Sequence, residues 1–193
     1  MWKILASRAR VAACTAVALM AACAWPVTAA ATAAPEYQLK AVFLFNFTQF
    51  VEWPAAPGAP NTPFVVGVLG EDPFHEALDQ TLSGETVNGR PLVLQRYARL
   101  EDVGDCQILF VSKSQAGQLD TVLSQLRDRP ILTVSDLGDF AGHGGTIEFV
   151  TVNNRLRLRI NAQSAALARL TISSKLLQLA DIVTTQPPPA QRN

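Results

Sequence analysis

The feature that most constrains the fold is a series of short apolar runs separated by helix-like segments between residues 62 and 136. Residues 62–70, TPFVVGVLG, form a valine-rich run bounded by prolines and by Glu-Asp-Pro, which is typical of a strand covered on both faces. Further strands are predicted at 91–97, 106–112 and 130–136. Helical spacing follows the first and third of these runs, so the order of elements predicts an α/β fold with a mainly parallel sheet.

The helix after the first strand is predicted to begin with Asp72 as its N-cap and Pro73 in its first turn, and to end at Gly84. The second helix is predicted through Leu119, Val122, Leu123 and Leu126, whose spacing places them on one face. Helices of these two segments are expected to cover both faces of the sheet.

The pattern changes after residue 136. Residues 144–150 and 154–160 are two strand-like runs joined by Asn153-Asn154, which predicts a β-hairpin. In its second strand the arginines alternate with Leu156, Leu158 and Ile160, and we interpret the arginine row as the solvent face of an edge pair rather than an anion site. Asn161 is predicted to cap one helix, and Ser173 or Ser174 a last helix through KLLQLADIV, 175–183. The prediction is thus a single compact α/β domain with helices on both faces and a C-terminal β-hairpin plus helices.

The first residues are typical of a secretory signal peptide. Three basic residues precede the apolar run 11–25, and small residues follow in motifs ending at Ala29 and Ala33. We therefore expect a signal peptide over 1–33, cleaved between 29 and 33, a domain over 36–183, and a disordered proline-rich tail over 184–193. Cys23 offers an alternative, because Met20-Ala21-Ala22-Cys23 loosely matches a lipobox that would anchor the chain as a lipoprotein.

Loss of the signal peptide changes the charge and the cysteine count. Three basic residues and no acidic residue precede Glu36, which leaves 13 basic against 16 acidic residues, a net charge of −3. A mildly acidic domain gives no reason to expect nucleic acid as a partner. Cys106 would remain alone, so no internal disulfide is expected, and its place in an apolar strand predicts a buried, unpaired thiol.

Residues 36–54, EYQLKAVFLFNFTQFVEWP, are rich in aromatic side chains but interrupted by polar ones, which excludes a stable transmembrane helix. Helical spacing predicts that an apolar stripe packs on the sheet, composed of Leu39, Val42, Phe43, Phe47, Phe50 and Val51. Phe45, Asn46, Thr48 and Gln49 lie off this stripe. These side chains are either further core or a contact surface.

Sequence motifs for an enzyme are missing. The chain has no G-x-S-x-G, no G-x-x-x-x-G-K-[ST] and no G-x-G-x-x-G. His75 and His143 are the only histidines, and neither has a second ligand at metal-binding spacing. We expect no enzymatic activity, no cofactor and no metal.

An alternative function is small-molecule binding. Three predicted strands end at Gly70, Ser112 and Ser135, with Asp72 and Asp136 just beyond. Ligands of open parallel sheets bind beyond the carboxyl ends of the strands, so these residues could line one cleft. Glycine, serine and aspartate are equally common in turns and caps, and the pattern alone does not decide between the two readings.

Eight segments together resemble the YfiR-like family of periplasmic proteins. They are EYQLKAVFLFNFTQFVEWP, VGVLGEDPF, TVNGRPL, DCQILFVSKS, ILTVSD, GGTIEFV, NRLRLRIN and ISSKLLQLADIV, in this order over 36–183. The resemblance implies a soluble, non-enzymatic repressor that binds the periplasmic part of a YfiN-type inner-membrane diguanylate cyclase and lowers cyclic di-GMP synthesis, and thereby affects biofilm formation. A YfiB-type outer-membrane lipoprotein that sequesters the repressor, and a homodimer, are also implied.

The sequence departs from the family in its cysteines. Cys106 matches a family cysteine, but its partner and a second pair expected around 142–149 are missing. Redox control through disulfides is therefore not expected. For partner contacts or pocket lining, we predict the solvent-facing positions Phe45, Asn46, Gln49 and Trp53. Ser112, Ser135 and Lys175 form a second group of candidates.

Overall fold

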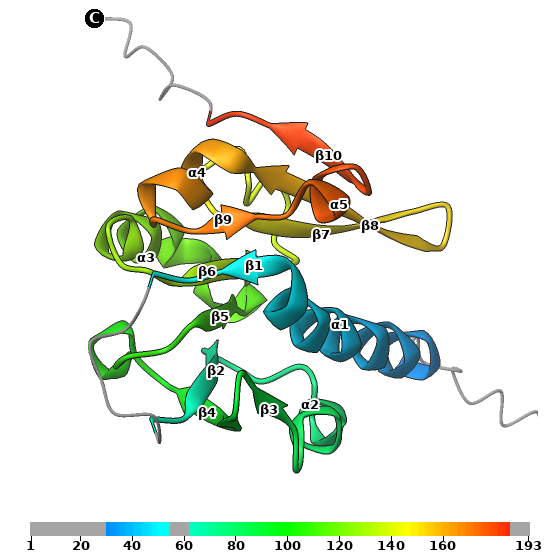
Figure 1. The fold of residues 1–193 in the computed structure, drawn as a ribbon. Helices are drawn as coiled ribbons and strands as arrows, with labels where there is room; N and C mark the ends of the chain where they lie inside the picture. The colour runs from blue at the N-terminus through cyan, green and yellow to red at the C-terminus, as the bar shows by residue number, and fades with distance from the viewer. Residues whose placement is uncertain (1–29, 55–61, 186–193) are drawn as a thin grey trace, which may run out of the picture.

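The four strands predicted between residues 62 and 136 are present in the computed structural model, which describes residues 30–54 and 62–185 (Figure 1). They are β2 (Phe64–Leu69), β4 (Arg90–Tyr97), β5 (Ile108–Val111) and β6 (Leu132–Ser135). All pair in parallel, in the spatial order β4-β2-β5-β6. The predicted α/β fold with a mainly parallel sheet is confirmed.

The predicted hairpin extends this sheet. Strand β7 (Ile147–Val152) lies parallel to β6, and β8 (Arg155–Asn161) returns antiparallel to β7. Asn153 and Asn154 have φ of 50° and 57°, the left-handed values that a tight two-residue hairpin turn requires. With β3 (Thr86–Val87) at one edge and β10 (Ala180–Val183) at the other, the order is β10-β8-β7-β6-β5-β2-β4-β3.

The prediction of one last helix over 175–183 is wrong in its second half. Ser173 caps helix α5, as predicted, but α5 covers only Ser174–Leu177. The chain then enters the sheet as β10, parallel to β8, with Ile182 opposite Ile160. Consequently β8 is not an edge strand, and its arginine row is only partly a solvent face.

Helices cover both faces of the sheet (Figure 1). Ile108 and Phe110 of β5 belong to the core under α1 (Ala30–Phe50), α2 (Glu76–Leu82) and α5, whereas Leu109 and Val111 belong to the core under α3 (Leu119–Leu126). This alternation follows from the twofold period of a strand, and all four side chains are fully buried. Val122, Leu123 and Leu126 form the buried face of α3, as predicted.

Helix α2 begins later than predicted. The Asp72 carboxylate accepts a hydrogen bond of 2.7 Å from the Phe74 amide and so closes a turn before the helix instead of capping it. His75, with φ of 51°, is the residue that precedes α2. The predicted end is confirmed, because Gly84 has φ of 76° directly after the last residues of the helix.

Short elements complete the described chain. They are β1 (Val51–Glu52), which pairs with β9 (Thr171–Ile172), helix α4 (Ala162–Leu167), and the 3-10 turns η1 (Leu100–Asp102) and η2 (Lys113–Gln118). Most of the predicted signal peptide, 1–29, and the predicted tail from 186 onward lie outside the described residues. Thr185 lies inside them, where its hydroxyl accepts a 2.9 Å hydrogen bond from the Asn161 amide.

Candidate functional site: an apolar groove beside the first helix

Helix α1 is apolar on two faces, and only one of them is buried. Ala41, Leu44 and Phe47 are fully buried against the sheet. Leu39 and Val42, however, are 46% and 44% exposed, so the prediction that they belong to the buried stripe is wrong. An apolar stripe on the solvent side of a helix is unusual in a monomeric domain and marks a candidate contact surface.

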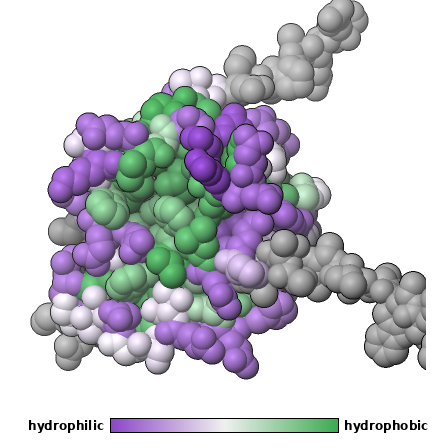
Figure 2. Space-filling model, turned by 90° about the vertical axis from the view of Figure 1, so that its right-hand side faces the viewer, coloured by the Kyte–Doolittle hydropathy of each residue, from purple (hydrophilic) through white to green (hydrophobic). Residues whose placement is uncertain are grey.

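The half-buried flank of α1 that carries Phe43, Asn46 and Phe50 forms one wall of a groove of about 390 Å³. Strand β8 and the segment from α5 to Leu179 form the rest. The lining residues are Phe43, Asn46, Phe47, Phe50, Arg155, Leu156, Arg157, Leu158, Leu176 and Leu179. Leu179 is 77% exposed at the rim. Figure 2 shows an apolar patch on this side of the molecule, surrounded by hydrophilic side chains.

A buried ion pair holds the N-terminal half of α1 against the sheet. Lys40 is only 1% exposed, and its ammonium lies 2.6 Å from the Glu36 carboxylate and 2.7 Å from Oδ2 of Asp136. The Tyr37 hydroxyl donates a 2.8 Å hydrogen bond to the same Oδ2, and Lys113 lies 3.4 Å from it. Asp136 follows β6 directly, so the pair fixes α1 at the carboxyl ends of the parallel strands.

The contacts in this cluster stabilise the charged form of the Asp136 carboxylate. Burial by itself raises the pKa of Asp136, but the hydrogen bonds from Lys40 and Tyr37 more than offset this, and its pKa lies below the usual value. Burial and the neighbouring carboxylate raise the pKa of Tyr37. Oδ1 of Asp136 is buried without a hydrogen-bond partner in the described part of the chain, so the carboxylate depends on the contacts of Oδ2.

The C-terminal end of α1 is fixed at the opposite ends of the strands, where β5 begins. The Trp53 indole N–H donates a 2.9 Å hydrogen bond to the Gln107 carbonyl, directly before β5. Its ring packs edge-on against Phe64, with 5.0 Å between the ring centroids. Anchored at both ends, α1 presents its outer stripe in a fixed position.

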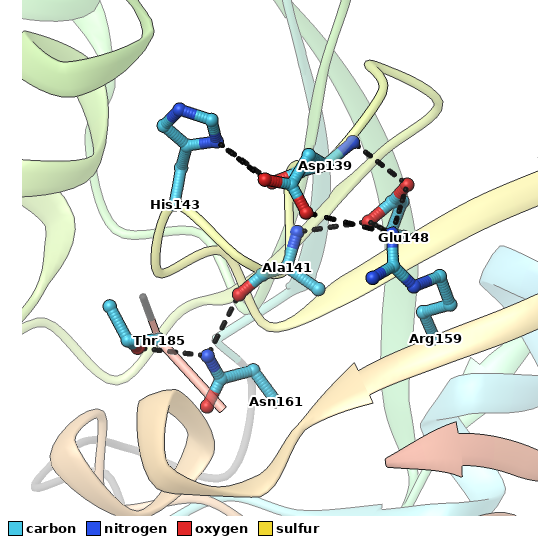
Figure 3. Close-up of polar contacts among 7 residues, drawn as sticks. All are labelled: Asp139, Ala141, His143, Glu148, Arg159, Asn161 and Thr185. Atoms are coloured by element: carbon cyan, nitrogen blue, oxygen red, sulfur yellow. Dashed lines mark hydrogen bonds and ion pairs between the residues drawn. The ribbon is translucent and has the colours of Figure 1, made fainter. Parts of the chain in front are cut away.

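A second polar network holds the strand on the far wall of the groove (Figure 3). Glu148 of β7 is 2% exposed and accepts hydrogen bonds from the Asp139 and Ala141 amides, at 3.0 and 3.2 Å. Arg159 of β8 lies 3.2 Å from the same carboxylate. A buried carboxylate with these donors ties β7, β8 and the preceding loop together.

Asn161 at the end of β8 extends this network. Its amide donates to the Ala141 carbonyl at 2.8 Å and to the Thr185 hydroxyl (Figure 3). Its Oδ1 accepts a 3.0 Å hydrogen bond from the Ser164 amide and so caps α4. The capping role was predicted, whereas the contacts to residues 20 and more positions away could not be read from the sequence.

The predicted site residues on α1 and beyond it have different surroundings. Asn46 lines the groove. Phe45 is half-buried against the main core, and Gln49 is exposed, with its amide 3.1 Å from the Thr48 hydroxyl. Trp53 and Lys175 do not line the groove: the indole of Trp53 contacts Gln107, and Lys175 is exposed on α5 next to the groove residue Leu176.

Ser112 and Ser135 lie at the carboxyl ends of β5 and β6, where the cleft was predicted. Both are buried, at 2% and 0% exposure. Ser112 caps η2 through the Ser114 amide, and Ser135 donates a 2.6 Å hydrogen bond to the Val111 carbonyl. Their hydroxyls therefore serve turns and strand ends, and Tyr37 and Lys40 of α1 meet Asp136 at these strand ends.

A smaller, polar cavity of about 200 Å³ lies elsewhere, between α3, α4 and the loop before β7. Its lining includes the buried side chains Thr133, Thr146 and Ser164, with Arg127 and His143 at its border. The Thr133 and Thr146 hydroxyls lie 3.2 Å apart.

Cys106 is buried, at 2% exposure, as the sequence predicted. Burial raises the pKa of its thiol to about 12, which makes it unreactive at neutral pH. Within residues 30–54 and 62–185, no group of three His, Cys, Asp or Glu side chains is placed to hold a metal ion.

Comparison with known sequences gives a match to a protein family. A sequence model of the YfiR/HmsC-like family matches residues 37–181, which include α1 from Tyr37 onward, the sheet as far as the first half of β10, and all residues that line the groove. No curated protein matches the chain. Among the described helices, none is both long enough and apolar enough to cross a membrane.

Proposed function

Because the chain belongs to the YfiR/HmsC-like family, we propose that it is a periplasmic, non-enzymatic regulator that binds the periplasmic part of an inner-membrane diguanylate cyclase and represses cyclic di-GMP synthesis. Residues 1–33 act as the signal peptide, and 36–183 form the regulatory domain. A YfiB-type outer-membrane lipoprotein, which would compete for the domain, and a homodimer belong to the same proposal.

The observation that carries the proposal is the exposed apolar face of α1. Leu39 and Val42 are nearly half exposed on a helix that Lys40 and Trp53 fix at both ends. Keeping apolar area in water is unfavourable by about 25 cal/mol per Å². A regulator that acts by contact needs such a preformed surface, since burying it on a partner supplies the binding free energy.

Direct binding tests this function. Each full-length membrane diguanylate cyclase of the source organism that has a periplasmic region would be placed in lipid nanodiscs and immobilised, and the purified protein titrated over it. We expect saturable binding to at least one cyclase and none to empty nanodiscs. Failure to bind any of them would refute the proposal.

A second candidate function, small-molecule binding, is favoured by the polar cavity between α3 and α4. Three buried hydroxyl groups, those of Thr133, Thr146 and Ser164, converge there with Arg127 at the border, and convergent polar groups in a concave site are typical of ligand pockets. A ligand that binds only the folded protein must raise its Tm. A thermal-shift screen with small polar metabolites tests this, and Ser164→Leu, which would fill the cavity, should abolish any shift that is found.

A further inference from the structure

We propose that the polar cavity between α3, α4 and the loop 137–146 binds a short aliphatic monocarboxylate that carries a hydrogen-bond donor at its other end, with the carboxylate at Arg127. The inference rests on the second candidate function, small-molecule binding, because it names the class of ligand that the cavity takes. It follows from the volume of the cavity, its surplus of hydrogen-bond donors and the positions of two charged side chains.

The volume of the cavity limits its ligand to a small one. At about 200 Å³, and with about 30 Å³ for each molecule of liquid water, the cavity holds roughly seven water-sized groups. Pockets for drug-sized ligands are larger, at about 300–1,000 Å³. A cyclic dinucleotide is therefore excluded as the occupant, and a four-carbon acid matches the volume.

Ser164 contributes a buried hydroxyl group that the protein itself does not satisfy. The residue is only 8% exposed, and its backbone amide is bound to Asn161. Its hydroxyl lines the cavity and makes no hydrogen bond within residues 30–54 and 62–185. A buried polar group without a protein partner is unfavourable. A ligand with an acceptor at this position would supply the missing hydrogen bond.

The threonines of the lining add further donors. Oγ1 of Thr133 accepts a 3.0 Å hydrogen bond from the Thr146 amide and lies 3.2 Å from Oγ1 of Thr146. Only one of the two hydroxyl protons can lie between these oxygens, so the other remains available to a ligand. Oγ1 of Thr185 accepts from the Asn161 amide at 2.9 Å and keeps its own proton as well (Figure 3). This surplus of donors favours a group that is rich in acceptors, such as a carboxylate.

Two charged side chains of α3 line the cavity at opposite ends. Asp120 lies in the first turn and Arg127 directly after the last, about 10 Å apart along the helix axis. Neither forms an ion pair in the described part of the chain. The Arg127 guanidinium can therefore bind a carboxylate through two parallel hydrogen bonds. Asp120 repels a second carboxylate and accepts a hydrogen bond from a hydroxyl or ammonium group, so the charges select a monocarboxylate with a donor at its far end.

The loop 137–146 is a rigid wall of the cavity. Asp139 has φ of 59°, and its amide donates a 3.0 Å hydrogen bond to Glu148. Gly142 leaves no room for a Cβ beside the Asp139 carboxylate, and Gly145 leaves none beside the ring of the fully buried Phe140. A loop that is fixed before the ligand binds does not have to be ordered by it, which lowers the entropic cost of binding.

Probes of matched length test the ligand class by isothermal titration calorimetry on the purified protein at constant ionic strength. 4-Hydroxybutyrate and 4-aminobutyrate carry a carboxylate at one end and a donor at the other, 1,4-butanediol lacks the carboxylate, and succinate has two carboxylates. We expect the first two to bind at least about tenfold more tightly than butanediol, because hydrogen bonds to a charged group are the stronger ones. They should bind about two- to fivefold more tightly than succinate, which Asp120 repels.

Variants of the lining locate the site. Ser164→Ala should weaken the binding of 4-hydroxybutyrate about tenfold, and Arg127→Gln about fivefold or more, since the Arg127 side chain is exposed. Asp120→Asn should tighten the binding of succinate about two- to fivefold. Ser174→Ala and Arg155→Gln are the matched controls, because both residues are exposed and lie outside the cavity. Each control should change the affinity by less than about twofold.

The outcomes separate the inference from the function on which it rests. An unchanged Tm of Ser164→Ala and Arg127→Gln would verify that both variants fold. If no small metabolite of any charge raises the Tm of wild type, the second candidate function fails, and the inference with it. If neutral metabolites bind and Ser164→Leu abolishes their binding, while both monocarboxylates fail to bind, the second candidate function stands and the proposed ligand class is wrong. Equal affinity of 4-hydroxybutyrate for wild type, Ser164→Ala and Arg127→Gln would place its site elsewhere and overturn the inference.

Discussion

Replacement of Lys40 by methionine should destabilise the domain strongly, although lysine is a residue that usually lies on the surface. The variant removes the ammonium group that lies 2.7 Å from Asp136 and leaves that carboxylate buried. Methionine retains most of the volume of the lysine stem, so the effect reports the charge rather than a cavity. Removal of one partner from a buried ion pair costs about 3–5 kcal/mol.

The structure places Lys40→Met at the lower end of this range. Tyr37 still donates to Oδ2 of Asp136, and Lys113 remains 3.4 Å away, so the carboxylate keeps part of its stabilisation. We therefore expect a loss of about 3 kcal/mol in the free energy of unfolding. For a domain of this size, each kcal/mol corresponds to about 2–4 °C, and the Tm should fall by about 6–12 °C.

Urea denaturation followed by circular dichroism measures this change, with Lys175→Met as the control. Lys175 is exposed on α5 and has no ion pair in the described residues, so its replacement should alter stability by less than about 0.5 kcal/mol. The double variant Lys40→Met with Asp136→Asn should recover part of the loss, because no charge remains buried. A cost below about 1 kcal/mol for Lys40→Met alone would refute the reasoning.

Three further predictions concern other buried groups. Glu148→Leu should destabilise by about 3 kcal/mol or more in the same urea assay, since Arg159 and two backbone amides lose their acceptor, and an effect under 1 kcal/mol would contradict it. Asn161→Ala should cost about 1–3 kcal/mol, through the lost α4 cap and two donated hydrogen bonds; equal urea midpoints would exclude this. Iodoacetamide at pH 8 should modify Cys106 only after unfolding, because burial raises its pKa to about 12, and rapid labelling of the native protein would show the burial to be wrong.

The ion pair also predicts a pH dependence. The pKa of Asp136 is lower in the folded state than its ordinary value of 3.8, so its contribution to stability is complete above that value and is lost as the pH falls through the lower folded pKa. The stability difference between wild type and Lys40→Met should therefore be constant from pH 7 to about pH 5 and shrink in more acidic solution. A difference that grows on acidification would contradict the assignment.

The central sheet could be predicted from the sequence because local patterns decide it. Continuous apolar runs gave β2, β5 and β6, and the Asn153-Asn154 pair between alternating strands gave the hairpin of β7 and β8. Each of these signals lies within a few residues of the element that it predicts, so no knowledge of the tertiary structure was needed.

Helix α1 shows where the periodicity of the sequence no longer decides the structure. Apolar side chains surround most of it, so either of two stripes could face the sheet. The prediction placed Leu39 and Val42 inside, whereas the structure buries Ala41 and Leu44. The decisive partner is Asp136, which binds Lys40 across 96 positions of sequence. No pattern local to α1 could reveal it.

Strand β10 failed as a prediction for a related reason. KLLQLADIV has helical spacing throughout, but β8 offers a free edge beside Ile160, and pairing with it decides the conformation of Ala180–Val183. Tertiary contacts thus override local propensity. Of the predicted site residues, Asn46 lies in the groove, while Ser112 and Ser135 lie at the carboxyl ends of β5 and β6. Which of these residues lie close together could not be inferred without the fold.

The measurement that tests the central claim most directly is the rate of cyclic di-GMP formation by the membrane cyclase, reconstituted in nanodiscs with GTP and increasing amounts of this protein. We predict that the rate falls to a plateau as the wild-type protein saturates the periplasmic region, and that Val42→Asp requires at least about tenfold more protein for the same effect. An unchanged rate with every membrane cyclase of the organism, at protein concentrations that saturate binding, would contradict the account.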